Sequence, residues 1–263
     1  MQKCIGIIGV GNMGEALLAG LVKAKQGQIC FAEKRDDRAA EIATHYGAVR
    51  KEISSIASEC DVIFLVVKPQ DLESTLGLLQ PSLGEKALLV SFVAGKTTSF
   101  IAERVKPTNA VVRVMPNTPT LIGKGMSAIS SGPNATAADL EFVSSILSTS
   151  GEVVTVDESL QDAVTSLSGS GPAYFFAFIE AIIDAGVELG LSEEIATKLA
   201  NQTILGAAEM LVQTGTSATT LRENVTSPNG TTAAALKVFA DEKLSEIVKR
   251  AMTAARDRSQ ELA

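Results

Sequence analysis

Histidine and tyrosine are scarce in this sequence, and tryptophan is missing. The 263 residues include one histidine, His45, and two tyrosines, Tyr46 and Tyr174. We expect His45 on the surface of a helix, so the chain offers no Ser-His-Asp triad, no histidine-rich zinc site and no histidine proton relay. Neither tyrosine has a lysine four residues later, which excludes the Tyr-Lys pair of one large class of dehydrogenases.

Cysteine is also scarce, and basic residues are fewer than acidic ones. Cys4, Cys30 and Cys60 are odd in number and lack metal-ligand spacing, so they predict small buried side chains, with no disulfide framework and no metal site. The net charge of -7 argues against nucleic acid or an anionic membrane as a partner. The apolar run after Lys3 is short and leads straight into a glycine turn. We therefore expect no signal peptide, a cytoplasmic protein and a small-molecule substrate.

A glycine-rich turn follows the first apolar run. Residues 4–8 predict a buried strand, Gly9-Val10-Gly11-Asn12-Met13-Gly14 a tight turn, and the residues after it an amphipathic helix. In such a turn Gly9 permits the bend, Gly11 lets phosphates approach the backbone, and Gly14 lets the helix pack on the strand. An ordinary strand-to-helix turn is the alternative. An acid near the end of the next strand, Glu33, favours a dinucleotide site.

Apolar runs alternate with helical stretches through the first 155 residues. This alternation predicts a Rossmann-type α/β domain with a parallel sheet and helices on both faces. Two more strands, 126–130 and 152–156, would flank a helix at 135–147, and their direction is open. Ligands lie at the carboxyl ends of such strands, so one rim is expected there. The segments that follow the strands are Gly9 to Gly14, Glu33 to Arg35, Lys68-Pro69, Ala94-Gly95 and Asn117-Thr118-Pro119.

The alternation stops after Asp157, and the pattern becomes helical to the end. We therefore predict a dinucleotide-binding domain at 1–155 and an all-helical domain at 156–263. Residues 173–189 are apolar nearly all round, with acids four apart at Glu180, Asp184 and Glu188. Three acids argue against a membrane span. A partner subunit is favoured over a central helix within one monomer, which predicts a homodimer.

The missing proton donors bear on the kind of substrate. A ketone needs a positioned acid during reduction, whereas a protonated imine already carries its proton. If the glycine turn holds a nicotinamide cofactor, the composition favours an imine.

Two turns in the helical part are candidates for ligand contact. Pro228-Asn229-Gly230 predicts a turn, with Thr231 or Thr232 capping the next helix. The amides there could hold a carboxylate, although an ordinary N-cap explains the pattern as well. The small residues of 167–174 predict either a plain helix start or close backbone approach to the nicotinamide.

Taken together, these motifs resemble the pyrroline-5-carboxylate reductase family over nearly the whole chain. The matching segments are Gly9 to Gly14, Val67-Lys68-Pro69, Arg113 to Pro119, Leu167 to Tyr174 and Val225 to Ala235. The resemblance implies reduction of L-1-pyrroline-5-carboxylate to L-proline by a Rossmann domain joined to an all-helical dimerisation domain. It also implies a homodimer with a site completed across it, and in some members a larger ring of dimers.

The resemblance assigns site residues as well. Thr232 corresponds to the threonine that hydrogen-bonds the substrate nitrogen and is the catalytic candidate. Substrate contacts are expected at Ser227, Asn229, Gly230, Thr231 and Thr232. Cofactor contacts are expected at Gly9, Gly11, Asn12, Met13, Gly14, Lys34, Arg35, Val67, Lys68, Pro69, Ala94, Gly95, Asn117 and Pro119.

The choice between NADPH and NADH depends on three consecutive residues. Glu33 stands where an acid would bind a ribose 2'-hydroxyl, which favours NADH, while Lys34 and Arg35 could bind a 2'-phosphate. We predict NADPH, with NADH as the weaker alternative and Arg35 as the main determinant.

Two other functions are alternatives to this reductase. One is a β-hydroxyacid dehydrogenase, which uses a lysine shortly after the glycine-rich start of the interdomain helix. The first lysine after Ser168 in this sequence is Lys198, which is too far along the chain to match. The other is an NADP-binding sensor without turnover.

Overall fold

The computed structural model describes residues 3–25 and 27–262. Chain contacts divide it into two compact units. The first holds the chain up to Ser170 together with the segment from Ala255 onward, and the second is Gly171–Ala254. Each unit is described separately below.

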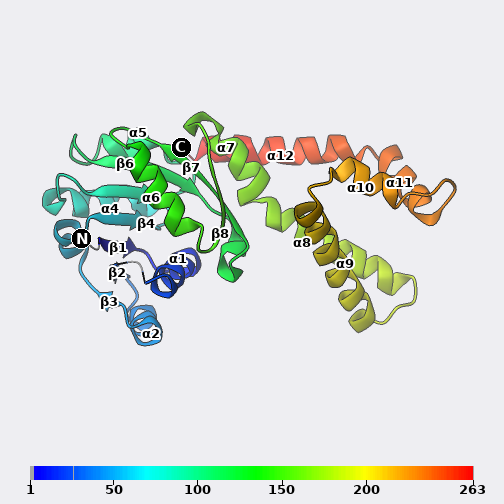
Figure 1. Cartoon of the computed structure of the whole chain (residues 1–263), viewed down its shortest axis with the longest axis horizontal. Helices are drawn as coiled ribbons and strands as arrows, with labels where there is room; N and C mark the ends of the chain where they lie inside the picture. The colour runs from blue at the N-terminus through cyan, green and yellow to red at the C-terminus, as the bar shows by residue number, and fades with distance from the viewer. Residues whose placement is uncertain (1–2, 26, 263) are drawn as a thin grey trace. The chain divides into compact units, whose positions relative to one another are not determined.

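The first unit is built on one sheet, which has eight strands among the described residues (Figure 1). Their order is β3-β2-β1-β4-β5-β6-β7-β8. β1 to β6 run parallel to one another, β7 is antiparallel to β6, and β8 is parallel to β7. The strands are β1 (Cys4–Ile8), β2 (Gln28–Ala32), β3 (Val49–Arg50), β4 (Val62–Leu65), β5 (Leu88–Ser91), β6 (Ala110–Met115), β7 (Gly125–Ser131) and β8 (Gly151–Thr155).

Helices cover both faces of the sheet because the strands carry apolar side chains on both faces. Ile5, Ile7 and Phe31 pack on one face, against α1 (Asn12–Lys23), α2 (Asp36–Tyr46) and α6 (Ala137–Leu147). Ile8 and Ile63 pack on the other, against α3 (Ile53–Glu59), α4 (Leu72–Leu79) and α5 (Thr98–Ala102). This is the doubly wound arrangement that near-continuous apolar strands predict.

The Rossmann-type prediction is confirmed, with two refinements. The two strands whose direction the sequence left undecided, 126–130 and 152–156, are present as β7 and β8. β7 runs antiparallel to β6, and β8 runs in the same direction as β7. β3 was not predicted, because it has only two residues and its Val49 side chain is 53% exposed. Short helical segments complete the unit: η1 (Pro69–Asp71), η2 (Gln80–Ser82), η3 (Thr118–Ile122), η4 (Glu158–Leu160), α7 (Gln161–Val164) and η5 (Thr165–Gly169).

The rest of the chain is helical, as predicted. It forms α8 (Gly171–Glu188), α9 (Glu193–Thr214), α10 (Ala218–Asn224), α11 (Thr231–Asp241) and α12 (Leu244–Glu261). Gly190 and Gly215 end helices with positive φ angles of 100° and 61°, which glycine adopts at no steric cost. The last turns of α12 belong to the first unit, where the Ser259 hydroxyl donates a hydrogen bond to Asp162 Oδ1 at 2.7 Å.

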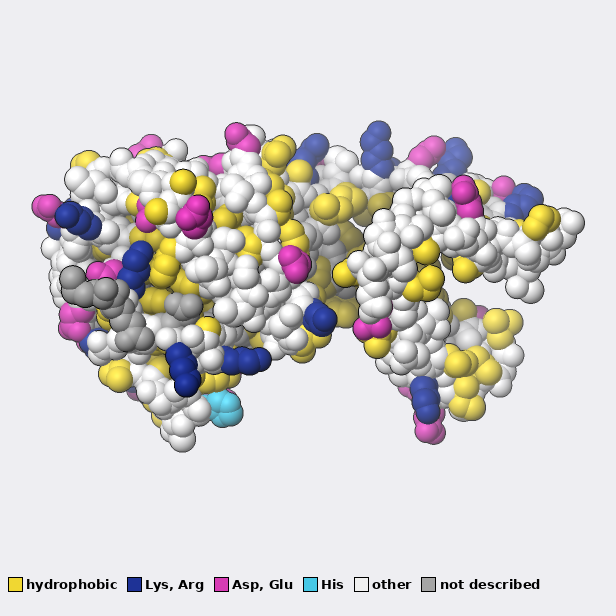
Figure 2. Space-filling view, in the orientation of Figure 1, with side chains coloured by type: hydrophobic (Ala, Val, Ile, Leu, Met, Phe, Trp, Pro, Cys, Tyr) yellow, Lys and Arg dark blue, Asp and Glu magenta, His cyan; other side chains and the backbone are white. Residues whose placement is uncertain are grey.

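Large apolar side chains stand exposed on the second unit. On α8 the Phe175 and Phe176 side chains are 62% and 68% exposed, and α9 exposes Leu205 and Val212 in the same way. Figure 2 shows hydrophobic side chains on the surface of the α8–α9 pair. Among the described residues, one stretch, Glu158–Glu188, has the length and hydropathy of a membrane span, which is weak evidence by itself. Its most apolar window is only 6% buried within the chain.

Candidate active site

The glycine turn has the backbone geometry that its sequence pattern predicts. Gly9 has a φ of +92°, and a β-carbon there would lie 2.5 Å from the Val66 carbonyl oxygen. A β-carbon at Gly14 would lie 2.0 Å from the Gly9 carbonyl oxygen. At Gly11 a β-carbon would meet no atom within 4 Å, so the space above this residue is open to a ligand.

Helix α1 begins directly after this turn, at Asn12. Its N-cap is Gly11, which has no side chain to satisfy the first amides of the helix. Unpaired amides at a helix N-terminus, together with the helix dipole, favour a bound anion such as phosphate. Asn12, Met13 and Gly14 therefore provide the kind of site that a pyrophosphate occupies.

Glu33 connects the end of β2 to the glycine turn. Its carboxylate accepts a hydrogen bond from the Val10 amide at 3.2 Å and another from the Arg35 amide at 3.1 Å. The side chain is only 10% exposed. The Glu33 carboxylate is thus held in place at the carboxyl end of β2, while the Arg35 side chain remains 62% exposed.

Arg38 was not predicted as part of the site, yet it holds the other side of the turn. Its Nε donates to the Val10 carbonyl oxygen at 3.1 Å, and its guanidinium pairs with Glu15 on α1. Burial alone would raise the pKa of Glu15, but hydrogen bonds from Arg38 and Tyr46 outweigh it and lower that pKa below its ordinary value. The side chain of Arg38 is 13% exposed. Arg38 is therefore a positioning residue for the turn.

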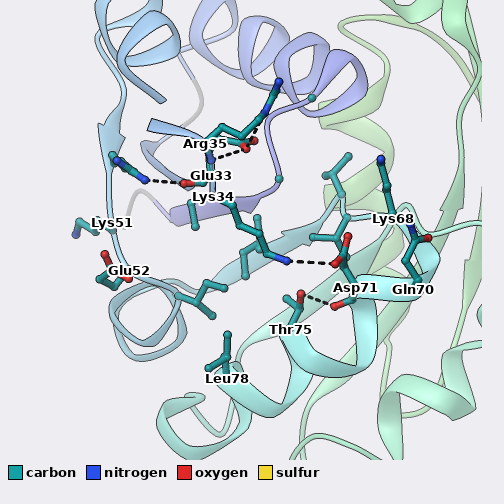
Figure 3. A pocket seen from close by; sticks show the side chains of 18 residues that line it. Glu33, Lys34, Arg35, Lys51, Glu52, Lys68, Gln70, Asp71, Thr75 and Leu78 are labelled. Atoms are coloured by element: carbon teal, nitrogen blue, oxygen red, sulfur yellow. Dashed lines mark hydrogen bonds and ion pairs between the residues drawn. The ribbon is translucent and has the colours of Figure 1, made fainter. Parts of the chain in front are cut away.

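A cavity of about 820 Å³ opens beside the glycine turn (Figure 3). The ends of β1, β2 and β4 surround it, at the point where the strand order reverses. Such a switch point is where doubly wound sheets bind nucleotides. Five cationic side chains line it together with three acids, and such cations can contact phosphate groups: Lys34, Arg35, Arg50, Lys51 and Lys68 with Glu33, Glu52 and Asp71. Arg50 and Lys51 also pair with Asp36 and Glu59, which lie outside the lining.

Six of the fourteen predicted cofactor residues line this cavity. They are Gly9, Gly11, Lys34, Arg35, Val67 and Lys68. Within it, the Lys34 ammonium pairs with Asp71 at 3.2 Å, as Figure 3 shows. Pro69 follows as the first residue of η1. Arg50 and Lys51 were missed because both come from the unpredicted strand β3 and the residue after it, where no sequence pattern marked them.

Four predicted contacts lie farther along the same edge of the sheet and do not line the cavity. Ala94 and Gly95 follow β5, and Asn117 and Pro119 follow β6. The Asn117 amide oxygen accepts a hydrogen bond from Met126 N at 2.8 Å, and its amide nitrogen lies 3.3 Å from Ser168 Oγ. Gly95 has a φ of +73°, and a β-carbon there would lie 2.7 Å from Leu262 Cβ. These residues are thus placed beyond the central switch point.

The predicted substrate residues form one turn in the second unit. The Gly230 amide donates to the Ser227 carbonyl oxygen at 3.0 Å, and Asn229 has a positive φ of 60°. The prediction that Thr231 or Thr232 caps α11 is wrong. Gly230 occupies the N-cap position, and no side chain caps the helix. The two hydroxyls are therefore not needed for capping.

Comparison with known proteins supports the pattern seen in both units. A family profile described as pyrroline-5-carboxylate reductase dimerisation matches residues 158–262. A second profile, described as coenzyme F420-dependent NADP oxidoreductase, matches residues 4–95. The chain is 41% identical over 264 residues to pyrroline-5-carboxylate reductase of Corynebacterium melassecola, covering 98% of this chain and 98% of that protein.

Two solved structures are similar over the full length. Pyrroline-5-carboxylate reductase from Coxiella burnetii matches with a TM-score of 0.93 at 34% identity, covering 100% of this chain and 99% of that one. The Plasmodium falciparum pyrroline carboxylate reductase, solved with NADP bound, matches with a TM-score of 0.89 at 32% identity, again covering 100% and 99%.

Proposed function

Because the chain belongs to the pyrroline-5-carboxylate reductase family, we propose that it reduces L-1-pyrroline-5-carboxylate to L-proline with NADPH, the last step of proline biosynthesis. The observation that supports this most is that the same chain contains a nucleotide cavity at the sheet's switch point and, in its second unit, a turn followed by two threonines whose hydroxyls are not used for capping. The absence of a histidine relay agrees with an imine substrate, which needs no strong acid beside the reacting carbon.

The residues of the first unit fit a dinucleotide. The open space at Gly11 and the uncapped start of α1 suit the pyrophosphate, and the cations of the cavity suit the remaining phosphate charge. We propose Val67 to Pro69, Ala94-Gly95, Asn117 and Pro119 as contacts farther toward the nicotinamide. When bound, the cofactor would supply the hydride that the imine carbon accepts.

The residues of the second unit fit the substrate. The uncapped first turn of α11 offers backbone amides to a carboxylate in the segment from Asn229 to Thr231, where the Gly230 amide is already bonded to the Ser227 carbonyl oxygen and the Thr231 amide begins the helix. We propose that Ser227 completes this pocket and that the Thr232 hydroxyl holds the ring nitrogen. A hydroxyl both donates and accepts, so Thr232 can orient the protonated imine and stay bonded to the amine that forms.

A direct assay tests the proposal. NADPH oxidation is followed with pyrroline-5-carboxylate and, separately, with a panel of 3-oxo acids, and NADP⁺ reduction is followed with the corresponding 3-hydroxy acids. We expect turnover with the imine alone and proline as the product. Turnover with a 3-hydroxy acid would assign the chain to the β-hydroxyacid dehydrogenases, and cofactor binding without turnover on any substrate would indicate a sensor.

Cofactor preference is predicted to depend on Arg35. Its Nε lies 3.5 Å from Glu33 Oε1, but the side chain is 62% exposed, so the guanidinium can still present N–H groups to a 2'-phosphate. We expect wild-type protein to have a higher kcat/KM with NADPH than with NADH. Arg35→Ala should lower the NADPH value about tenfold, since an exposed charge-assisted bond contributes about 1.4 kcal/mol. The NADH value should change little.

Arg256→Ala provides the matched control, because Arg256 is also half-exposed but bonds only to its neighbour Asp257 among the described residues. It should leave both values unchanged. An equal or higher kcat/KM with NADH in the wild type would contradict the assignment of NADPH.

Homodimerisation is proposed through the exposed apolar face of α8. Phe175 and Phe176 on this helix are too exposed for a stable isolated surface, and the matched family profile is a dimerisation domain. Rings of dimers, a domain boundary near residue 156 and a cytoplasmic location are further parts of the proposal. No contact with membrane or nucleic acid is proposed.

Phe176→Glu is expected to convert the dimer to a monomer, because a buried unpaired carboxylate at the interface would cost several kcal/mol. Light scattering should then give the mass of one chain. Val49→Glu adds the same charge at an exposed apolar residue of the first unit and should leave the dimer intact. A wild-type chain that is monomeric at micromolar concentration would overturn the proposal.

A further inference from the structure

The three cysteines of the chain, far apart in sequence, lie together in the first unit. Cys60 Sγ is 3.3 Å from Cys4 Sγ and 3.4 Å from Cys30 Sγ. All three sulfur atoms lie within 4.8 Å of one another. Cys4 is the first residue of β1, Cys30 is the middle residue of β2, and Cys60 directly follows α3. Nothing in their sequence spacing predicts this cluster.

The cluster is held rigidly and opens to solvent on one side. Cys30 and Cys60 are 1% and 5% exposed under α3, whereas Cys4 is half-buried. The Cys60 amide donates to the Ile56 carbonyl oxygen at 3.0 Å, and the Cys4 amide donates to Asp61 Oδ2 at 2.8 Å. These bonds hold the backbone at Cys4 and Cys60 in place, and the cluster is accessible to solvent through Cys4.

We propose that this three-cysteine cluster binds a soft divalent cation of the Zn²⁺ or Cd²⁺ class, with solvent as the fourth ligand. Three thiolates at about 2.3 Å from a tetrahedral metal lie about 3.8 Å apart. The two short sulfur separations therefore need to open by about 0.4 Å, which small side-chain rotations allow. Binding releases the thiol protons to solvent and changes no oxidation state.

The donor set selects the class of metal. Among the described residues no carboxylate or imidazole joins the three sulfurs, so hard cations such as Mg²⁺ have no suitable ligand. Three thiolates and a divalent cation leave one negative charge. Lys51, which pairs with Glu59, and Glu59 itself are charged side chains that interact electrostatically with Cys30.

The placement indicates a structural site. Gly9 follows Cys4 by five residues of extended chain, about 16 Å at the usual strand rise. The cluster lies toward the amino ends of the strands, while the nucleotide cavity lies at their carboxyl ends. A bound cation would cross-link β1, β2 and the start of β4 without touching the cofactor residues.

Cadmium titration of the reduced full-length protein, without oxygen, tests the site. The thiolate-to-cadmium charge-transfer absorption should rise linearly and saturate at one Cd²⁺ per chain. Because the chain has only these three cysteines, that band reports this cluster. Zn²⁺ in large excess should lower the cadmium band, Mg²⁺ at the same excess should not, and one equivalent of either soft cation should raise Tm.

Two variants separate binding from folding. Cys60→Ser removes the central sulfur and should abolish the band at one equivalent. Cys4→Ser changes a half-buried residue and should keep the wild-type circular dichroism spectrum while weakening Cd²⁺ binding at least about tenfold. A folded Cys4→Ser variant that binds like wild type would overturn the proposal. So would saturation below one Cd²⁺ per chain, or reduced protein that shows no band and forms only a Cys30–Cys60 disulfide in air.

Discussion

Thr232→Ala is expected to lower kcat about a hundredfold with pyrroline-5-carboxylate, the low end of what a positioned proton-transferring or orienting side chain contributes. The hydroxyl is proposed to contact the ring nitrogen, whose charge and geometry change as hydride reaches the neighbouring carbon. An interaction that strengthens in the transition state is lost mainly from kcat, so KM should change little. Steady-state kinetics at saturating NADPH measure both values.

The structure also indicates that this substitution is tolerated by the fold. Thr232 is half-buried in the first turn of α11, and Gly230 caps that helix. Alanine is a good helix former, so Tm should stay within a few degrees of the wild type. Thr232→Ser, which restores the hydroxyl, should recover most of kcat.

Thr226→Ala is the matched control on the same turn. The Thr226 hydroxyl donates to the Arg222 carbonyl oxygen at 2.6 Å, so it is already occupied within the chain. Its removal should change kcat by less than about threefold, the effect of a modest structural adjustment. A Thr232→Ala variant with the kcat of wild type would remove this residue from the reaction.

Much of the first unit follows from sequence because its signals are local. Each buried parallel strand is a short apolar run, and β2 and β6 begin and end where the runs do. The glycine turn is equally clear from the sequence, since Gly9 and Gly14 leave no room for a side chain and Gly11 leaves space open for a ligand. For the same reason the carboxyl edge of the sheet could be identified before any coordinates were known.

The missed features depend on contacts between distant residues. β3 is two residues long and exists because it pairs with β2, which no local pattern encodes. The role of Arg38 requires knowing that α2 returns to the carbonyl of Val10. The cysteine cluster has no sequence signature, because residues 4, 30 and 60 meet only through the order of the strands.

The cap of α11 was mistaken for a different reason. Threonine is a good N-cap by propensity, but the turn that precedes the helix ends at Gly230, which takes the N-cap position. The end of that turn, and not capping propensity, therefore sets where the helix begins. That displacement leaves Thr231 and Thr232 inside the helix start, with their hydroxyls available for another partner.

Alanine substitutions at the three glycines of the nucleotide turn are expected to separate folding from cofactor binding. Gly9→Ala and Gly14→Ala place a β-carbon 2.5 Å and 2.0 Å from backbone carbonyl oxygens, which have no room to move. Gly9 also has the positive φ that alanine resists. Overpacking and strain of this kind cost about 1–3 kcal/mol or more, so both variants should unfold at clearly lower temperature or denaturant concentration.

Gly11→Ala should behave in the opposite way. Its β-carbon meets no protein atom within 4 Å, so Tm should remain near that of the wild type. The added methyl group instead occupies space that the pyrophosphate requires, and the Kd for NADPH should rise at least about tenfold, equivalent to 1.4 kcal/mol. Gly77→Ala, on α4 with equally open surroundings, is the control and should alter neither quantity adversely. Unchanged NADPH affinity in a folded Gly11→Ala protein would mean that the cofactor does not cross this turn, whereas loss of affinity with Tm intact would place its phosphates there.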